Sequence, residues 1–213
     1  MLTGAAFLVL HSSFFMSCSE DDTDVEEFDN WQVRNEAYFA TLDDSLSNTD
    51  YSWQRLLSYS LSSAVPHQST DYIYVKKIHQ GTGTESPMLT DSVRVSYQGR
   101  LLPTAGNPQG KVFDGTAYGT YADATNSTVK LVMVANGTES LLTGWITALL
   151  NMHRGDHWRI YIPQELGYKK NDQTSNSTGE VTIPAYSTLV FDITLVDFSP
   201  AGTAMKPYRA PRR

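Results

Sequence analysis

Residue types that could perform chemistry occur in this chain, but their spacing matches no familiar catalytic or metal site. His153 and His157 flank Asp156, yet Gly155 between them breaks helical register, so we expect exposed surface residues rather than metal ligands. Gly81-Thr82-Gly83 lacks the later glycine, the lysine and the following helix of a phosphate-binding loop. The many serines have no histidine and acid partners at a recognisable spacing. We therefore predict no metal, no cofactor and no serine hydrolysis.

The segment from Leu141 to Asp192 carries the most information. It contains Leu141-Leu142-Thr143-Gly144-Trp145, an apolar helix-like stretch, a strand ending at Ile162-Pro163, and the apolar run 188–192. We expect none of these stretches to supply a nucleophile, a general base or a metal ligand, but their aromatic and branched side chains are expected to converge on one concave apolar site. This composition indicates a binding pocket that catalyses, if at all, without acid or base.

The elements that must position this pocket follow from hydrophobic periodicity. Before residue 66, apolar residues recur at spacings of three, four and seven within 25–46, and again within 51–61, which predicts two amphipathic helices. Such short helices cannot bury enough surface alone, so they should pack on the following domain or pair between molecules. Residues 62–70, with Pro66, are the predicted linker.

Beyond Asp71 the apolar period changes to two, which is typical of strands. In the first predicted strand, Tyr72, Tyr74 and Lys76 alternate with Ile73, Val75 and Lys77. In each of the later strands the apolar residues share one face: Val93, Val95 and Tyr97; Trp158, Ile160 and Ile162; Leu189, Phe191, Ile193 and Leu195. Short strands joined by turns and interrupted by one helix predict an α+β domain, with an antiparallel sheet and a helix on its inner face. The polar stretch 169–179 has no apolar anchor and is expected to be a mobile loop.

Several motifs between 71 and 198 occur in the order found in FKBP-type peptidyl-prolyl cis-trans isomerases, which this region resembles. They are Val95-Ser96-Tyr97-Gln98-Gly99, Val112-Phe113-Asp114, Leu141-Leu142-Thr143-Gly144-Trp145, Met152-His153-Arg154-Gly155, Ile162-Pro163-Gln164-Glu165-Leu166-Gly167-Tyr168, and Ile183-Pro184 followed by Thr188-Leu189-Val190-Phe191-Asp192. The resemblance implies a half-barrel antiparallel sheet wrapped around a short helix, preceded here by the amphipathic helices.

The resemblance also implies an activity, which is rotation of the peptide bond before proline, and a set of pocket residues. Those carried over as catalytic are Tyr97, Phe113, Asp114, Leu142, Trp145, Tyr168 and Phe191, and those carried over as substrate-binding are Leu141 and Ile183. Trp145 is the expected floor, and the Leu142 N–H and the Tyr168 hydroxyl are expected donors to a substrate carbonyl. Asp114 either orients Tyr97, meets the twisted amide, or only caps the turn at Gly115.

Three departures from the family pattern leave a second interpretation open. Lys169 stands where glycine is common, Val129 or Leu131 where an aromatic is usual, and Ser96 where histidine is common. The alternative is a non-catalytic chaperone or peptide-binding lipoprotein that keeps the pocket. Either version implies proline-containing polypeptides as partners and tacrolimus-type or rapamycin-type compounds as ligands.

The termini and the charge suggest location and exclude one class of partner. Residues 1–17 are largely apolar and are followed by Cys18, the single cysteine of the chain. This arrangement resembles a bacterial lipoprotein signal, and the resemblance implies that Cys18 is lipidated. A net charge of -7 argues against nucleic-acid binding. We expect a protein of the cell envelope, lipid-anchored at the outer membrane, facing the periplasm or the surface, with homodimerisation through the N-terminal helices as an option. The predicted organisation is a signal peptide over 1–17, an acidic tether over 18–24, a helical extension over 25–66, the isomerase domain over 67–199 and a basic tail over 200–213.

Overall fold

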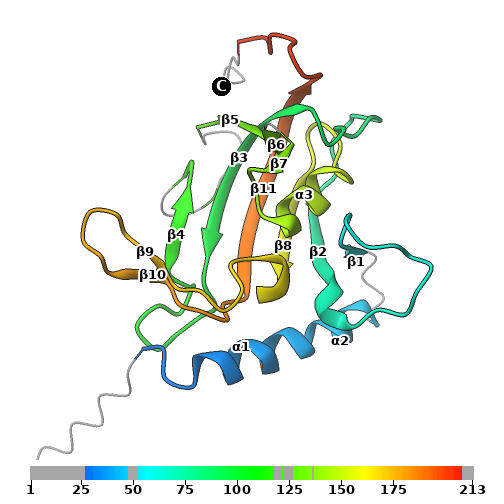
Figure 1. Ribbon diagram of the computed structural model, residues 1–213. Helices are drawn as coiled ribbons and strands as arrows, with labels where there is room; N and C mark the ends of the chain where they lie inside the picture. Colours follow the sequence, from blue (N-terminus) through cyan, green and yellow to red (C-terminus); the bar gives the residue numbers. More distant parts are fainter. Residues whose placement is uncertain (1–26, 48–51, 118–120, 122–126, 136, 208–213) are drawn as a thin grey trace, which may run out of the picture.

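One antiparallel sheet organises the molecule (Figure 1). The computed structural model describes residues 27–47, 52–117, 121, 127–135 and 137–207, so the predictions for residues 1–24, including Cys18, and for the end of the basic tail lie outside the described residues. The main sheet has seven strands in the order β1-β2-β8-β11-β3-β4, with β5 also paired to β3. Their bounds are β1 Trp53–Leu57, β2 Tyr72–His79, β3 Ser92–Arg100, β4 Val112–Gly115, β5 Val129–Val132, β8 His157–Ile162 and β11 Leu189–Ser199.

The remaining elements are short. Two small hairpins pair β6 Val134–Ala135 with β7 Thr138–Glu139 and β9 Gln173–Thr174 with β10 Val181–Ile183. The helices are α1 Trp31–Ala40, α2 Leu42–Leu46 and α3 Thr143–Leu149, with 3-10 turns η1 Ser69–Asp71 and η3 Gln164–Leu166. None of the helices in the described ranges is long and apolar enough to cross a bilayer.

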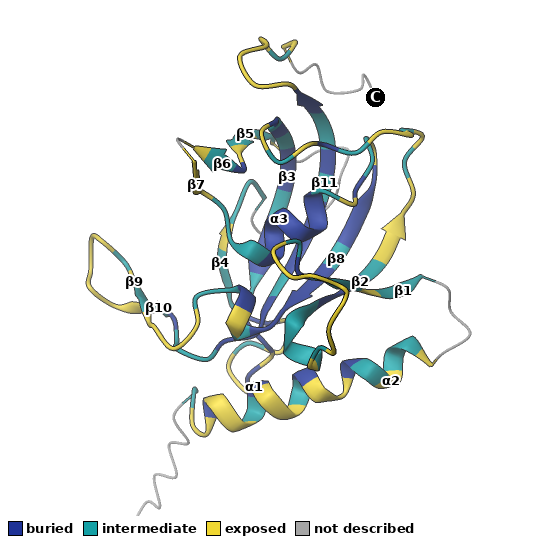
Figure 2. Cartoon of the chain, turned by 45° about the vertical axis from the view of Figure 1, so that its right-hand side comes forward, coloured by how far each residue is buried: buried dark blue, intermediate teal, exposed yellow. Residues whose placement is uncertain are grey.

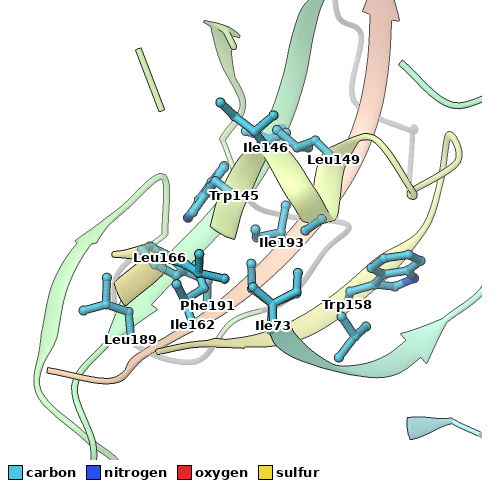
Figure 3. Close-up of a cluster of buried hydrophobic side chains, with 14 of the residues drawn as sticks. Ile73, Trp145, Ile146, Leu149, Trp158, Ile162, Leu166, Leu189, Phe191 and Ile193 are labelled. Atoms are coloured by element: carbon cyan, nitrogen blue, oxygen red, sulfur yellow. The ribbon is translucent and has the colours of Figure 1, made fainter. Parts of the chain in front are cut away.

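The central helix α3 lies against the inner face of the sheet, as predicted for an α+β domain. Figure 2 shows it almost entirely buried, and Figure 3 shows Ile73 and Ile193 of the sheet among the side chains beneath it. Gly144 allows this close approach, because a Cβ at this position would lie 2.5 Å from Cγ2 of Ile162. The predicted strand faces are confirmed: the apolar residues of β8 and β11 named above are all buried, as are Val93 and Val95 of β3.

The N-terminal helices cover the opposite face of the sheet near β2 and β8. Since side chains alternate along a strand, Tyr74 and Tyr161 point away from α3, and Phe39 and Leu42 pack on them. The Phe39 and Tyr74 rings meet edge to face at 5.1 Å. The prediction that this region packs on the following domain is therefore confirmed for α1 and α2.

Two predictions of local structure were wrong. The amphipathic pattern in 51–61 is not a helix: β1 is an edge strand paired with β2, and Trp53 stacks on Tyr161 at 5.5 Å. The extension therefore shares one sheet with the region after residue 67. The polar stretch 169–179 is not a loop throughout, because its residues Gln173 and Thr174 form β9, which pairs with β10.

Candidate functional site

A cavity of about 450 Å³ opens beside the first turn of α3, a volume suited to a small ligand or a peptide side chain. Its walls come from β3, β4, β5, α3, β11 and the segments around residues 140 and 168. The described residues that line it are Tyr97, Asp114, Leu131, Glu139, Ser140, Leu141, Leu142, Trp145, Tyr168 and Phe191. Seven of the nine residues predicted from sequence are in this set.

Trp145 is the centre of the aromatic cluster. Its indole is 4% exposed, and it projects from the first turn of α3 toward Phe191 and Leu166 (Figure 3). The Tyr97 and Phe191 rings meet it edge to face, at 5.0 Å and 5.1 Å between ring centroids. Edge-to-face pairs add roughly 0.5–1.5 kcal/mol each beyond the burial of area, so they fix the indole firmly.

Phe113 supports the wall from behind and does not line the cavity. Its ring contacts Phe191 edge to face at 5.4 Å. Gly99 of β3 makes room for both rings, because a Cβ there would lie 2.4 Å from Cε1 of Phe191 and 2.8 Å from the Phe113 ring. The glycine of the Tyr97-Gln98-Gly99 motif thus has a packing role.

Asp114 contacts the pocket and also caps a turn. The Tyr97 hydroxyl donates to Oδ2 of Asp114 at 2.8 Å, and the backbone N–H of Gly115 donates to Oδ1 at 2.8 Å. Two of the alternatives considered for this aspartate therefore occur together. The first fixes the rotation of the Tyr97 phenol at the pocket wall.

Tyr168 and Leu142 offer the hydrogen-bond donors. Burial, and then the negative charge of Asp114, raise the pKa of Tyr168, so its phenol stays protonated at neutral pH. Leu142 is the N-cap residue of α3, and within the described part of the chain its backbone N–H donates to no other group. Both donors border a cavity whose floor is apolar, where a carbonyl that leaves water needs a partner.

Ile183 does not line the cavity. It is 4% exposed and belongs to the buried core at the end of β10. Conversely, three lining residues were not assigned to the site from sequence: Leu131, Glu139 and Ser140. Leu131 was named only for the region in which the family usually has an aromatic residue. Glu139 and Ser140 directly precede Leu141 in the sequence, and this adjacency to a predicted pocket residue was the signal that could have identified them.

The stretch from His153 to His157 lies outside the pocket. Within the described ranges no group of three or more His, Cys, Asp or Glu side chains could hold a metal ion. The prediction that His153 to His157 are surface residues was wrong for two of them. Asp156 is 2% exposed and accepts hydrogen bonds from the N–H groups of Gly81 and His153, and His157 is 8% exposed beside Asp192.

A larger, open hollow of about 750 Å³ lies between α1 and residues 164–171. Its lining is mainly amide and charged side chains, including Glu36, Glu165 and Lys170, with Tyr186 as its single aromatic among the described residues. The smaller cavity is the better candidate site, because aromatic walls and a few convergent polar groups are typical of a specific ligand pocket.

Comparison with known proteins agrees with this geometry. The family model described as FKBP-type peptidyl-prolyl cis-trans isomerase matches residues 83–196. The Escherichia coli K12 protein "FKBP-type peptidyl-prolyl cis-trans isomerase FkpA" is 31% identical over 146 residues, 68% of this chain and 44% of that protein. The "FKBP-type 22 kDa peptidyl-prolyl cis-trans isomerase" of the same organism is 36% identical over 121 residues, 56% of this chain and 47% of that protein.

Among solved structures, that of FkpA from Escherichia coli matches with a TM-score of 0.53 and 25% identity, covering 82% of this chain and 63% of the other. The chain thus spans about half the length of the curated relatives it matches. The family match covers the strands and the helix that build the pocket. The chain belongs to the FKBP-type peptidyl-prolyl cis-trans isomerase family.

Proposed function

We propose that this protein catalyses cis-trans isomerisation of the peptide bond before proline. The observation that carries the proposal is the Trp145 pocket, in which the Tyr97 and Phe191 rings meet the indole edge to face beside two hydrogen-bond donors. Membership of the family supports the same activity. Proline-containing polypeptides are the proposed substrates.

The physical basis is differential stabilisation of a twisted amide. Amide resonance sets a barrier of ~18–20 kcal/mol to rotation, and the planar amide has more charge separation than the twisted one. An apolar cleft disfavours the planar form, and edge-on aromatic rings hold the pyrrolidine ring in place. Binding energy from the ring is thus used to favour the rotated bond.

Polar groups at the rim fix the orientation of the substrate. In the proposed mechanism the Leu142 N–H and the Tyr168 hydroxyl donate to substrate carbonyls. Asp114 holds the Tyr97 phenol through the 2.8 Å hydrogen bond, so the wall is set before the substrate arrives. Pre-set walls and donors lower the entropy lost in the transition state.

A protease-coupled assay on a proline peptide, with and without tacrolimus or rapamycin, tests the proposal. Uncatalysed isomerisation takes tens to hundreds of seconds at 25 °C, so modest acceleration is measurable. Two matched variants separate the pocket from general stability, because Trp145→Leu and Trp158→Leu each remove one buried indole and only Trp145 lines the cavity. We expect a loss of activity in the first and retention in the second. No acceleration by the wild-type chain rejects the enzymatic proposal.

A second function, peptide binding without catalysis, is favoured by two observations. Leu131 is an aliphatic part of the pocket wall, where the family usually supplies an aromatic, and Lys169, where glycine is common, has a left-handed backbone with φ 61°. The residue after Tyr168 therefore carries strain that glycine would avoid. Binding of proline peptides without rate enhancement would support this function.

We further propose that the protein is lipidated at Cys18 and assists the folding of exported proteins from the cell envelope. The support is the sequence alone: apolar residues 1–17, a small residue before the cysteine and the acidic tether 18–24 after it. Labelling with a fatty acid tests the anchor, and Cys18→Ser should abolish both the label and recovery in the membrane fraction. Homodimerisation through the N-terminal helices stays a prediction, which light scattering on the full chain tests.

A further inference from the structure

Glu139 sits at the rim of the Trp145 pocket, and the proposed mechanism gives it no role. It belongs to β7, is exposed, and is one of the residues that line the cavity. The second acid of the lining is Asp114, on β4. Among the described residues that line the cavity there is no lysine or arginine, so the rim presents two negative charges and no positive one.

The Glu139 carboxylate is held in place from two sides. The Tyr59 hydroxyl donates a hydrogen bond to Oε1, and the Thr143 hydroxyl donates to Oε2 at 3.0 Å. Tyr59 is itself fixed, because its backbone N–H donates to Oγ1 of Thr147 at 3.2 Å, on α3. The segment after β1 therefore positions a charge at the pocket, although it lies outside the residues matched by the family model.

A role limited to stabilising α3 does not account for the whole arrangement. An acid near a helix N-terminus is favourable, and Thr143 is in the first turn of α3. However, two carboxylate oxygens can accept about four hydrogen bonds, and the two protein donors leave acceptor capacity open toward the cavity. Lys130, which precedes the lining residue Leu131 in β5, does not line the cavity, because successive side chains of a strand point to opposite sides.

We propose that Glu139, together with Asp114, selects substrates that carry lysine or arginine next to the proline, an inference that rests on the proposed isomerase function. The pyrrolidine ring takes the apolar floor, and the cationic side chain extends along the acidic rim. Glutamate or aspartate at the same place in the peptide meets like charge and is disfavoured. The net charge of -7 acts in the same direction at longer range.

The test compares kcat/KM of the full chain for peptides that differ only in the residue before proline: lysine, leucine or glutamate. Each screened carboxylate at the rim is expected to favour the lysine peptide over the glutamate peptide roughly threefold in low salt. The two carboxylates together therefore predict a preference of about tenfold. The ratio should fall toward one at 1 M salt, where the Debye length is about 3 Å. In Glu139→Gln we expect the ratio of kcat/KM for the lysine peptide to kcat/KM for the glutamate peptide to fall about threefold. The leucine peptide, which carries no charge at this position, reports any general loss of activity in the variant.

Two further variants sharpen the test. Glu36→Gln removes an equal charge from the exposed face of α1, away from the pocket, and should leave the ratio unchanged. Tyr59→Phe keeps the carboxylate but removes one of its two donors, so the ratio should fall by less than in Glu139→Gln. Equal rates for lysine and glutamate peptides, or equal ratios in wild type and Glu139→Gln, would overturn the proposal.

Binding of the same three peptides, followed by fluorescence anisotropy, keeps this proposal separate from the proposed function. Preference for the lysine peptide in binding without any turnover would support the selectivity and reject the isomerase. Turnover of all three peptides with no charge preference in rate or binding would reject the selectivity and support the isomerase.

Discussion

Replacing Asn35 by alanine should weaken the docking of α1, because this side chain accepts a buried hydrogen bond from the chain segment that leads into β11. Asn35 is 1% exposed. Its Nδ2 donates to the Trp31 carbonyl at 2.7 Å, and its Oδ1 accepts from the backbone N–H of Thr188 at 2.7 Å. Trp31 adds a buried hydrogen bond from its indole to the Ser187 hydroxyl at 2.8 Å.

The magnitude follows from what the substitution leaves behind. A buried N–H without a partner costs about 1–3 kcal/mol, and the second hydrogen bond contributes about 1 kcal/mol. Alanine returns about 0.6 kcal/mol through its higher helix propensity. We therefore expect a loss of roughly 1.5–3.5 kcal/mol from the free energy of unfolding, a large part of the 5–15 kcal/mol typical of a domain.

Urea denaturation followed by tryptophan fluorescence measures this loss, and limited proteolysis detects a helix that detaches before global unfolding. Gln32→Ala is the matched control, because Gln32 lies on the same helix, is exposed and bonds only to the exposed Glu36 among the described residues. We expect the control to change stability by less than about 0.5 kcal/mol. If Asn35→Ala falls within that range too, the reasoning about α1 docking is wrong.

Two other perturbations test the pocket wall and the outer face of the sheet. Gly99→Ala places a methyl group 2.4 Å from the Phe191 ring, so it should cost about 1–3 kcal/mol and lower kcat/KM for a leucine-proline peptide; unchanged stability and activity would contradict the packing described. Burial of Asp192 is outweighed by the hydrogen bonds from His157 and Arg159, so its pKa is lowered from 3.8. Because the folded-state pKa is the lower one, the contribution to stability is full well above pH 3.8 and is lost as the pH falls through the folded pKa. Acid titration of the unfolding free energy should therefore be flatter in Asp192→Asn than in wild type between about pH 5 and 2, and equal slopes would contradict this.

Periodicity predicted the main architecture because the largest strands bury one continuous face. The residues at every second position of β8 and β11 pack beneath α3, and that alternation is visible without coordinates. The pocket residues were predictable for a different reason. They were carried over from the resemblance to the family, because they belong to motifs that occur here in the family's order. One of these motifs contains Gly144, whose missing Cβ lets α3 approach Ile162.

The segment containing β1 could not be assigned from sequence because its structure depends on a distant partner. Trp53 and Leu57 are four residues apart, which fits one helix face as well as one strand face over so short a window. The decisive interaction is pairing with β2, and Trp53 also stacks on Tyr161 of β8. His157 is similarly buried through distant partners, because it lies in β8 between β2 and β11 and its ring contacts Asp192, 35 residues away.

NMR exchange spectroscopy on a proline peptide with a small amount of the full chain tests the central claim most directly. It reports rotation of the peptide bond without a coupled protease, while the indole N–H signal of Trp145 reports where the peptide binds. We predict cis-trans exchange peaks with the wild-type chain, a shift of the Trp145 signal on peptide addition, and loss of the exchange peaks in Trp145→Leu. Exchange that persists in Trp145→Leu, or a bound peptide that leaves the Trp145 signal unmoved, would contradict the account.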